Sequence, residues 1–178
     1  MSLERTAAVR PFPTEAFGDV LVANERYTAS RTPSELSGWA ARGIAVVTCM
    51  DSRIDPLGVL GLQPGDAKIL RNAGARVTED VLRTLVLAAY LLGVERVLVM
   101  PHTDCRMGKG EEADVHEAIH QQHGVDTRSI EFRTVADQRA ALITDVTRIR
   151  SYPLLPDSLV VGGAILDIVS GRLDPVEA

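Results

Sequence analysis

The stretch from Ile44 to Arg53 constrains the fold more than any other part of the chain. It opens with an apolar run rich in β-branched residues, which predicts a strand buried on both faces of a sheet. The run stops at Cys49, and Asp51 and Arg53 follow directly. We therefore expect the reactive side chains of the protein at the end of this strand.

A second strand is predicted over 96–101 by another apolar run, and it ends in the same way. His102, Asp104 and Cys105 follow it. Parallel strands of one sheet end at the same edge, so these two strands would bring two thiols and one imidazole together.

Helices are predicted between the strands. Thr78 can cap a helix over 79–92, and Gly93 can end that helix. The helix is apolar over most of its surface, which predicts that it is largely buried. It joins a short strand over 67–70 to the strand over 96–101, as expected for a right-handed βαβ crossover.

The rest of the chain continues this alternation. We expect an amphipathic helix over Thr14–Ser30, a polar surface helix within 108–123, a helix that Thr134 caps, and a strand over 158–165 before a hairpin-like turn at Ser170 and Gly171. The prediction is an α/β fold with a mainly parallel β-sheet flanked by helices, and with an N-terminal helix extending from the core. We expect one domain over 1–178.

Composition excludes several classes of partner. The chain is 46% hydrophobic and 24% charged, which is typical of a globular protein, and its net charge of −5 argues against nucleic acid. No apolar stretch is long enough for a membrane span, and the first residues lack the apolar core of a signal peptide. We expect a soluble, cytoplasmic protein with a small-molecule substrate.

Cys49, His102 and Cys105 are a ligand set suited to zinc, and three protein ligands leave one of four tetrahedral positions open, as in catalytic sites. A disulfide between the two cysteines is formally possible, but thiols near a histidine in a reducing cytosol are more often metal ligands or nucleophiles. The structural alternative is that each cysteine is a small buried apolar residue and that His102 only ends a strand.

Asp51 and Arg53 are two residues apart and project to one side of an extended segment. Their pairing would keep the carboxylate ionised and oriented. The alternative is an ordinary ion pair that braces a loop. Asp104 lies between the ligands, either supporting them or simply exposed. The histidines His116, His120 and His123 share a helical face, which we interpret as solvated rather than as a second metal site.

The whole pattern resembles the β-class carbonic anhydrases. Its elements are Cys-x-Asp-x-Arg after one strand, His-x-x-Cys after another, the segment Arg71–Ala75 and the segment Val161–Ile168 followed by Ser170 and Gly171. The resemblance runs from about Val20 to Leu173. Arg106 departs from it, because many members carry glycine after the second cysteine.

The resemblance implies that Zn²⁺ binds to Cys49, His102 and Cys105, and that Asp51, held by Arg53, orients hydroxide toward carbon dioxide. It also implies substrate contacts near Gly74 and Ala75, and assembly as a homodimer or a dimer of dimers. The implied reaction is the reversible hydration of carbon dioxide to bicarbonate and a proton.

Two other functions are compatible with these residues. Some similar short proteins hydrolyse carbonyl sulfide or carbon disulfide with the same zinc and Asp-Arg pair. A non-catalytic zinc or redox-sensing module is the third possibility, but the intact Asp51 and Arg53 argue against it, because a sensor needs neither.

Overall fold

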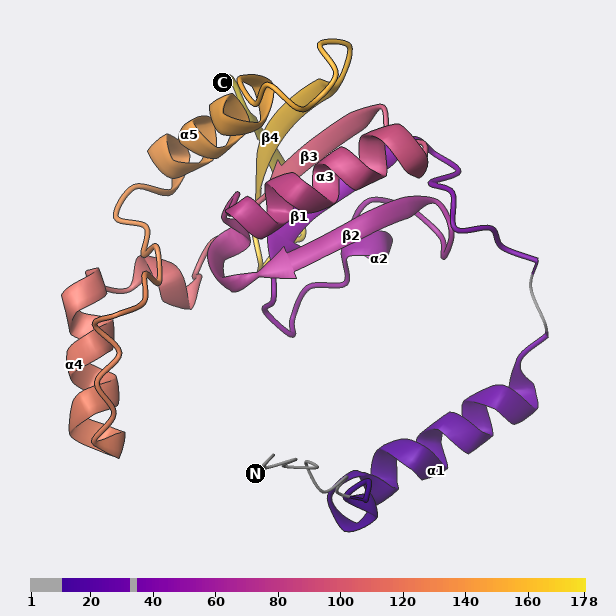
Figure 1. Ribbon diagram of the computed structural model, residues 1–178, viewed down its shortest axis with the longest axis horizontal. Coiled ribbons are helices and arrows are strands. Elements are labelled where there is room, and N and C mark those ends of the chain that lie inside the picture. The colour runs from indigo at the N-terminus through magenta and orange to yellow at the C-terminus, as the bar shows by residue number, and fades with distance from the viewer. Residues whose placement is uncertain (1–10, 33–34) are drawn as a thin grey trace, which may run out of the picture. The chain divides into compact units, whose positions relative to one another are not determined.

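The computed structural model describes residues 11–32 and 35–178, and it contains two compact units, Met1–Leu36 and Ser37–Ala178. In the first unit, helix α1 spans Thr14–Ser30, as the sequence predicts, and none of its residues is buried. In the described ranges every strand belongs to the second unit (Figure 1). That residues 1–178 act as one domain stays a prediction.

A five-stranded sheet forms the centre of the second unit, in the order β2-β1-β3-β4-β5. The first four strands are parallel, and β5 pairs with β4 in the antiparallel direction. The strands are β1 Ile44–Cys49, β2 Ala67–Asn72, β3 Arg96–Met100, β4 Val160–Leu166 and β5 Leu173–Val176. The predicted α/β class with a mainly parallel sheet is confirmed.

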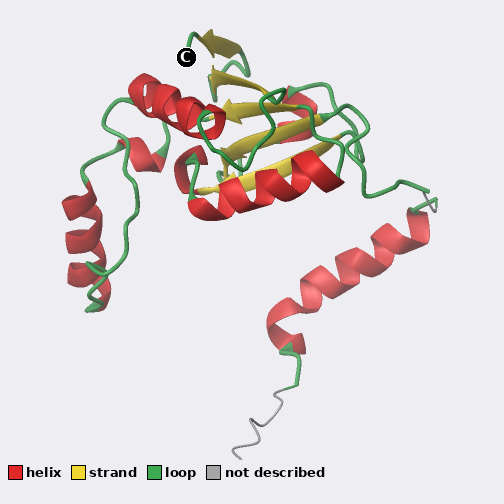
Figure 2. Ribbon diagram, turned by 45° about the horizontal axis from the view of Figure 1, so that its top comes forward, coloured by secondary structure: helices red, strands yellow, loops and turns green. Residues whose placement is uncertain are grey.

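Helices lie on both faces of this sheet (Figure 2). Helices α3 Glu79–Leu91 and α5 Gln138–Arg150 pack on one face, and α2 Pro56–Val59 packs on the other. Helix α4 Glu112–His123 extends away from the sheet (Figure 1), and two short 3₁₀ turns are η1 Ala73–Ala75 and η2 Arg106–Gly108. Side chains of β1 alternate between two clusters, because successive residues of a strand point to opposite faces. Ala45 and Val47 pack with α3 and α5, whereas Val46 belongs to a smaller cluster that includes Val59 of α2.

The register brings the ends of β1 and β3 together. Thr48 of β1 lies opposite Met100 of β3, and its buried hydroxyl donates to the Met100 carbonyl over 2.8 Å. The residues that follow each strand therefore leave the sheet at one edge, as the sequence predicts.

Two helix predictions need correction. The helix expected from a Thr134 cap is α5, and it begins at Gln138 with the carboxylate of Asp137 as its cap. The cause is a long-range contact, because the Val135 N–H donates to the Met107 carbonyl over 2.8 Å and holds this segment against η2.

Helix α3 is capped by Thr78 as predicted, but it is not buried on most of its surface. Its buried residues are Val81, Leu82, Leu85 and Ala88, while Leu87, Tyr90 and Leu91 are exposed in the single chain.

No helix in the described ranges is both long enough and apolar enough to cross a membrane. The cytoplasmic location stays a prediction.

Candidate metal centre

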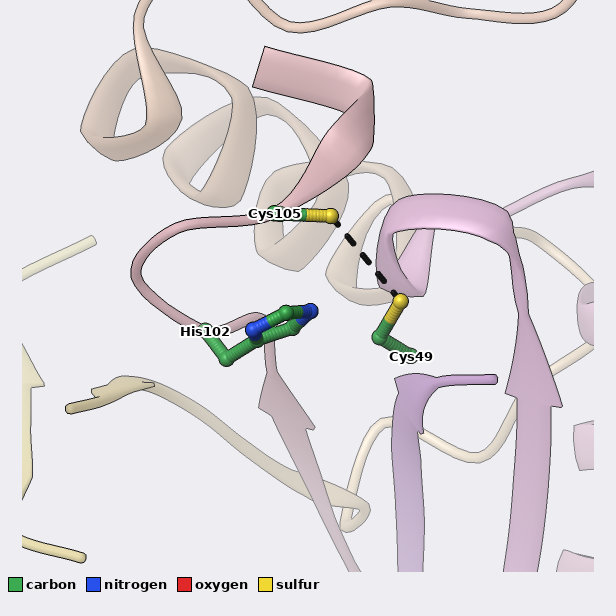
Figure 3. A group of neighbouring side chains, drawn as sticks. All are labelled: Cys49, His102 and Cys105. Carbon is green, nitrogen blue, oxygen red and sulfur yellow. Dashed lines mark hydrogen bonds between the residues drawn. The ribbon is translucent and has the colours of Figure 1, made fainter. Parts of the chain in front are cut away.

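Three potential metal ligands converge at the edge where β1 and β3 end. Cys49 is the last residue of β1, and His102 and Cys105 lie on the loop after β3. Their ligand atoms all lie within 4.8 Å of one another, and the two Sγ atoms are 3.9 Å apart (Figure 3). Both cysteines are free thiols, since a disulfide needs a sulfur separation of about 2 Å. Within the described residues this is the one such group of potential ligands.

The imidazole of His102 is prepared to bind a metal. Its Nδ1 lies 2.8 Å from the Thr103 carbonyl, which can only accept, so Nδ1 carries the proton and Nε2 carries the lone pair. Nε2 is buried and is the one buried side-chain nitrogen or oxygen of the described residues without a hydrogen-bond partner. Since an unpaired buried acceptor is costly, this atom is suited to bind a metal ion.

The two thiols interact with each other. The hydrogen bond from Cys105 lowers the pKa of Cys49 to about 4, and the Gly74 N–H, 3.4 Å from the Cys49 sulfur, acts in the same direction. The same contact with Cys49 raises the pKa of Cys105. The two shifts favour the thiolate at Cys49 and the protonated thiol at Cys105, and metal binding requires that both thiols lose their protons.

Asp51 and Arg53 form the pair that the sequence predicts. Arg53 donates from Nε to Asp51 Oδ1 over 2.9 Å and from Nη2 to Asp51 Oδ2 over 2.7 Å, and its backbone N–H also donates to Oδ1. These donors hold the pKa of the Asp51 carboxyl well below its usual range. Asp51 Oδ2 lies 3.7 Å from His102 Nε2, which places the carboxylate beside the three ligands.

A second pair in the chain has the same local geometry. Arg128 donates from Nε and Nη2 to the two carboxylate oxygens of Asp126 over 2.9 and 2.7 Å. Yet the Asp126 side chain is 55% exposed, against 19% for Asp51. The bidentate geometry is therefore a property of Asp-x-Arg turns, and its position beside His102 is what marks the Asp51 pair.

The predicted substrate residues lie next to the ligands. Gly74 and Ala75 are buried, and both line a cavity of about 300 Å³ that also reaches Cys105. Gly74 has φ of +78°, and an added Cβ there would lie 3.2 Å from the Met107 side chain, so the position requires glycine. The cavity wall is mixed: it holds apolar side chains such as Val99 and Leu142, and also the charged side chains of Asp104, Lys109 and Asp145.

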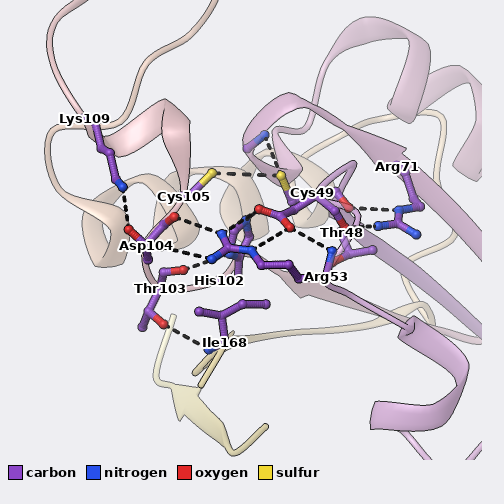
Figure 4. Close-up of polar contacts among 12 residues, drawn as sticks. Thr48, Cys49, Arg53, Arg71, His102, Thr103, Asp104, Cys105, Lys109 and Ile168 are labelled. Carbon is purple, nitrogen blue, oxygen red and sulfur yellow. Dashed lines mark hydrogen bonds and ion pairs between the residues drawn. The ribbon is translucent and has the colours of Figure 1, made fainter. Parts of the chain in front are cut away.

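Two residues support the site: Arg71, whose role the sequence did not indicate, and Asp104, which the sequence left as either supporting or exposed. Arg71 donates from Nε to the Cys49 carbonyl over 2.9 Å and from Nη2 to the Asp51 carbonyl over 2.6 Å, which fixes the backbone between them. Asp104 pairs with both Arg53 and Lys109 (Figure 4). Both residues stand in notable positions, because Arg71 begins the Arg71–Ala75 segment and Asp104 directly precedes Cys105. The sequence does not reveal which groups they contact.

Comparisons with known proteins agree with this geometry. The sequence model of the carbonic anhydrase family matches residues 44–173. β-Carbonic anhydrase 1 of Mycobacterium tuberculosis is 34% identical over 161 residues, which cover 89% of this chain and 96% of that protein. The chain belongs to the β-carbonic anhydrase family.

Two further relatives bear on fold and substrate. The crystal structure of carbonic anhydrase from Streptococcus mutans has a TM-score of 0.86 at 34% identity, and the match covers 94% of this chain and 100% of that one. A carbon disulfide hydrolase of Acidithiobacillus thiooxidans is 26% identical over 155 residues, covering 75% of this chain and 77% of the relative. The chain is thus an enzyme of a zinc lyase family, and its fold is that of the β-carbonic anhydrases.

The histidine face of α4 lies apart from this centre. His116 Nδ1 lies 2.8 Å from Thr127 Oγ1, and its ring packs on Phe132 with centroids 5.2 Å apart. His120 and His123 are exposed. In the described residues the three histidines do not form a metal-ligand group. The face is exposed at His120 and His123, but the His116 side chain is only 17% exposed, so the interpretation of a solvated face is wrong for His116.

Arg106, the departure from the family pattern, is exposed and donates to the Lys109 carbonyl over 3.4 Å. It bonds to the loop of η2 and not to the carboxylate of Asp51 or Asp104.

Proposed function

We propose that the protein catalyses the reversible hydration of carbon dioxide to bicarbonate and a proton, with zinc held by Cys49, His102 and Cys105. The observation that carries this proposal is the buried, unpartnered His102 Nε2 between two thiols and beside a carboxylate that an arginine holds. Two sulfurs and one imidazole nitrogen are ligands that zinc prefers. Bound zinc supplies a Lewis acid that ionises water near neutral pH.

Two of the three ligands, Cys49 and His102, have separate supports in the chain. Gly74 donates to the Cys49 sulfur, the Thr103 carbonyl fixes the tautomer of His102, and Thr103 itself donates its N–H to the Leu166 carbonyl of β4. Such supports orient ligands before the metal binds, which strengthens binding.

Asp51 supplies the acceptor that orients the attacking water. Its carboxylate is ionised because Arg53 lowers its pKa, and two-point bonding to the guanidinium fixes the direction of its remaining lone pairs. Two thiolate ligands cancel the formal charge of zinc, so water is less acidic here than at a site of three histidines. An acceptor of fixed orientation therefore contributes more to the reaction rate at this centre than at a site of three histidines.

Carbon dioxide is small and neutral, and the cavity beside Cys105 offers apolar side chains, Val99 and Leu142 among them, on part of its wall. Gly74 and Ala75 line it on the side of the ligands, so we assign them to substrate binding.

A stopped-flow assay of carbon dioxide hydration on protein of measured zinc content tests this function. We expect hydration well above the uncatalysed rate with one zinc per chain. Full zinc without hydration would contradict the proposal and would support a non-catalytic zinc module.

Hydrolysis of carbonyl sulfide or carbon disulfide is the second candidate, favoured by the similarity to the carbon disulfide hydrolase of Acidithiobacillus thiooxidans. The two substrates are linear molecules like carbon dioxide, so access to the cavity decides between them. Measuring sulfide release from each substrate against the hydration rate on one preparation ranks the three reactions. We expect hydration to be the fastest.

We also propose that the chain assembles as a homodimer or a dimer of dimers. The exposed apolar side chains of α3, Leu87, Tyr90 and Leu91, need a partner surface, and α1 has no buried residue of its own. Sedimentation at micromolar concentration should give at least twice the chain mass of 19.2 kDa. Leu91→Lys should shift this equilibrium toward monomer, whereas Val169→Lys, at an exposed valine outside α3, should not. A parent species of one chain mass would contradict the proposal.

A further inference from the structure

Asp104 links two loops of the site that lie far apart in sequence. It sits after β3 between His102 and Cys105, and it accepts from Arg53, which sits after β1. Arg53 Nη1 donates to Asp104 Oδ2 over 3.1 Å, and Arg53 Nη2 donates to the Asp104 carbonyl over 3.2 Å (Figure 4). The other oxygen, Asp104 Oδ1, lies 2.6 Å from Lys109 Nζ. The charges alternate along the chain Asp51, Arg53, Asp104 and Lys109.

The backbone at Asp104 is unusual. Its φ is +54°, a left-handed conformation that few residues other than glycine adopt, although Asp and Asn adopt it more easily than most. Non-glycine residues in this region cost free energy, and they cluster at functional sites. Here the conformation places both the carboxylate and the carbonyl of one residue on the same guanidinium.

A single ion pair at this exposure would order Arg53 poorly. The Arg53 side chain is 47% exposed, and exposed ion pairs are weak because water competes for both partners. The Asp126–Arg128 pair shows the isolated case, since in the described residues Arg128 bonds to Asp126 and to no second carboxylate, and its side chain is 80% exposed. Arg53 differs because its Nε and Nη2 donate to Asp51, while its Nη1 donates to a second carboxylate, that of Asp104.

We propose that Asp104 is a positioning residue, which fixes the guanidinium of Arg53 and through it the orientation of the Asp51 carboxylate. Without the Asp104 carboxylate, Arg53 keeps its bonds to Asp51 and one bond to the backbone carbonyl of residue 104, but it loses the charged acceptor on the second loop. The Asp51 and Arg53 side chains can then move together, and the acceptor loses its fixed direction. With Asp104, the position of Arg53 is set by the loop that carries two of the three ligands. The effect on catalysis rests on the proposed hydration reaction.

Two substitutions separate this role from strain in the loop. Asp104→Gly removes the side chain, and glycine adopts the positive φ at this position without strain. Asp104→Asn removes the charge but keeps a residue that tolerates positive φ and an uncharged oxygen that can accept from Arg53. Asp126→Asn is the matched control, because it removes the same charge from a pair of the same geometry away from the centre.

The experiment combines kinetics with a direct view of Arg53. On the full chain loaded with zinc, we would measure kcat and KM for carbon dioxide, zinc content, and the solvent exchange of arginine Nε–H groups by ¹⁵N NMR. Arg128 Nε–H serves as the internal reference in the same spectra.

We expect Asp104→Gly to lower kcat roughly ten-fold with unchanged KM and zinc, and Asp104→Asn to lower it less, in line with the loss of a residue that orients an active group. Arg53 Nε–H exchange should accelerate in the same order, while exchange at Arg128 stays at the parental rate. Asp126→Asn should leave kcat unchanged.

Parental exchange at Arg53 in Asp104→Gly overturns the proposal, whatever happens to kcat, because Arg53 would then be ordered without Asp104. Faster exchange with parental kcat overturns the catalytic part. If the parent protein does not hydrate carbon dioxide, the proposed function fails, and the exchange measurement still decides whether Asp104 positions Arg53.

Discussion

Replacing Cys49 by serine is expected to leave the purified protein with little or no zinc, and Cys105→Ser should do the same. A serine hydroxyl has the size of the thiol but is not ionised at neutral pH, so it cannot replace a thiolate ligand. Loss of a residue that merely orients a ligand costs about 10–100-fold in metal affinity, so loss of a direct ligand should cost more than ~100-fold.

Elemental analysis of zinc per chain measures this effect. The fold should persist, because the larger apolar cluster between the sheet and helices α3 and α5 does not include the ligands. Near-ultraviolet circular dichroism checks that point. The matched control is the triple substitution of His116, His120 and His123 by alanine, which should keep one zinc per chain. Full zinc in both cysteine variants would show that the cluster is not the metal site.

Sequence reasoning succeeded where the determinants are local. The apolar run at Ile44–Cys49 predicts β1 because a strand in the middle of a sheet is buried on both faces, and Thr78 predicts the start of α3 because its hydroxyl accepts from the Val81 N–H. The convergence of Cys49 and Cys105 followed from one inference, namely that parallel strands end at the same edge.

Sequence reasoning failed where contacts between distant parts of the chain determine the structure. The start of α5 depends on the bond between Val135 and Met107, which no local pattern reveals. The pairing of Arg53 with Asp104 joins residues 51 positions apart. Asp126 and Arg128, which the sequence analysis did not consider, repeat the Asp-x-Arg pattern of Asp51 and Arg53. The pattern alone therefore does not identify the pair at the site.

Asp51→Ala is expected to retain zinc and fold while losing most carbon dioxide hydration. The carboxylate is bonded to Arg53 and lies 3.7 Å from His102 Nε2, and under the proposed function it is an acceptor beside the ligands and not one of them. Removing one preorganised hydrogen-bonding group from an active site typically costs a factor of about 100–1,000 in kcat. Arg53→Ala should act in the same direction, because an unpaired Asp51 is free to turn away.

The control for this prediction is Asp126→Ala, which breaks an Asp-x-Arg pair of the same geometry elsewhere in the chain. It should leave both zinc content and hydration rate at parental values. Near-parental hydration in Asp51→Ala would show that the Asp51–Arg53 pair braces the loop and has no part in the reaction.

The pH dependence of the rate separates the role of Asp51 from ionisation of the attacking water. Arg53 holds the pKa of Asp51 far below its usual value of about 3.9, so this carboxylate stays ionised from acidic to alkaline pH. A rise in the hydration rate between pH 6 and 9 therefore reports another group, and the ionising water is the group that the reaction requires. The residual rate of Asp51→Ala should then climb with pH as the parental rate does. A flat profile in Asp51→Ala beside a rising parental profile would instead show that the pH dependence comes from Asp51 itself, through a change of partner that the pairing with Arg53 does not prevent.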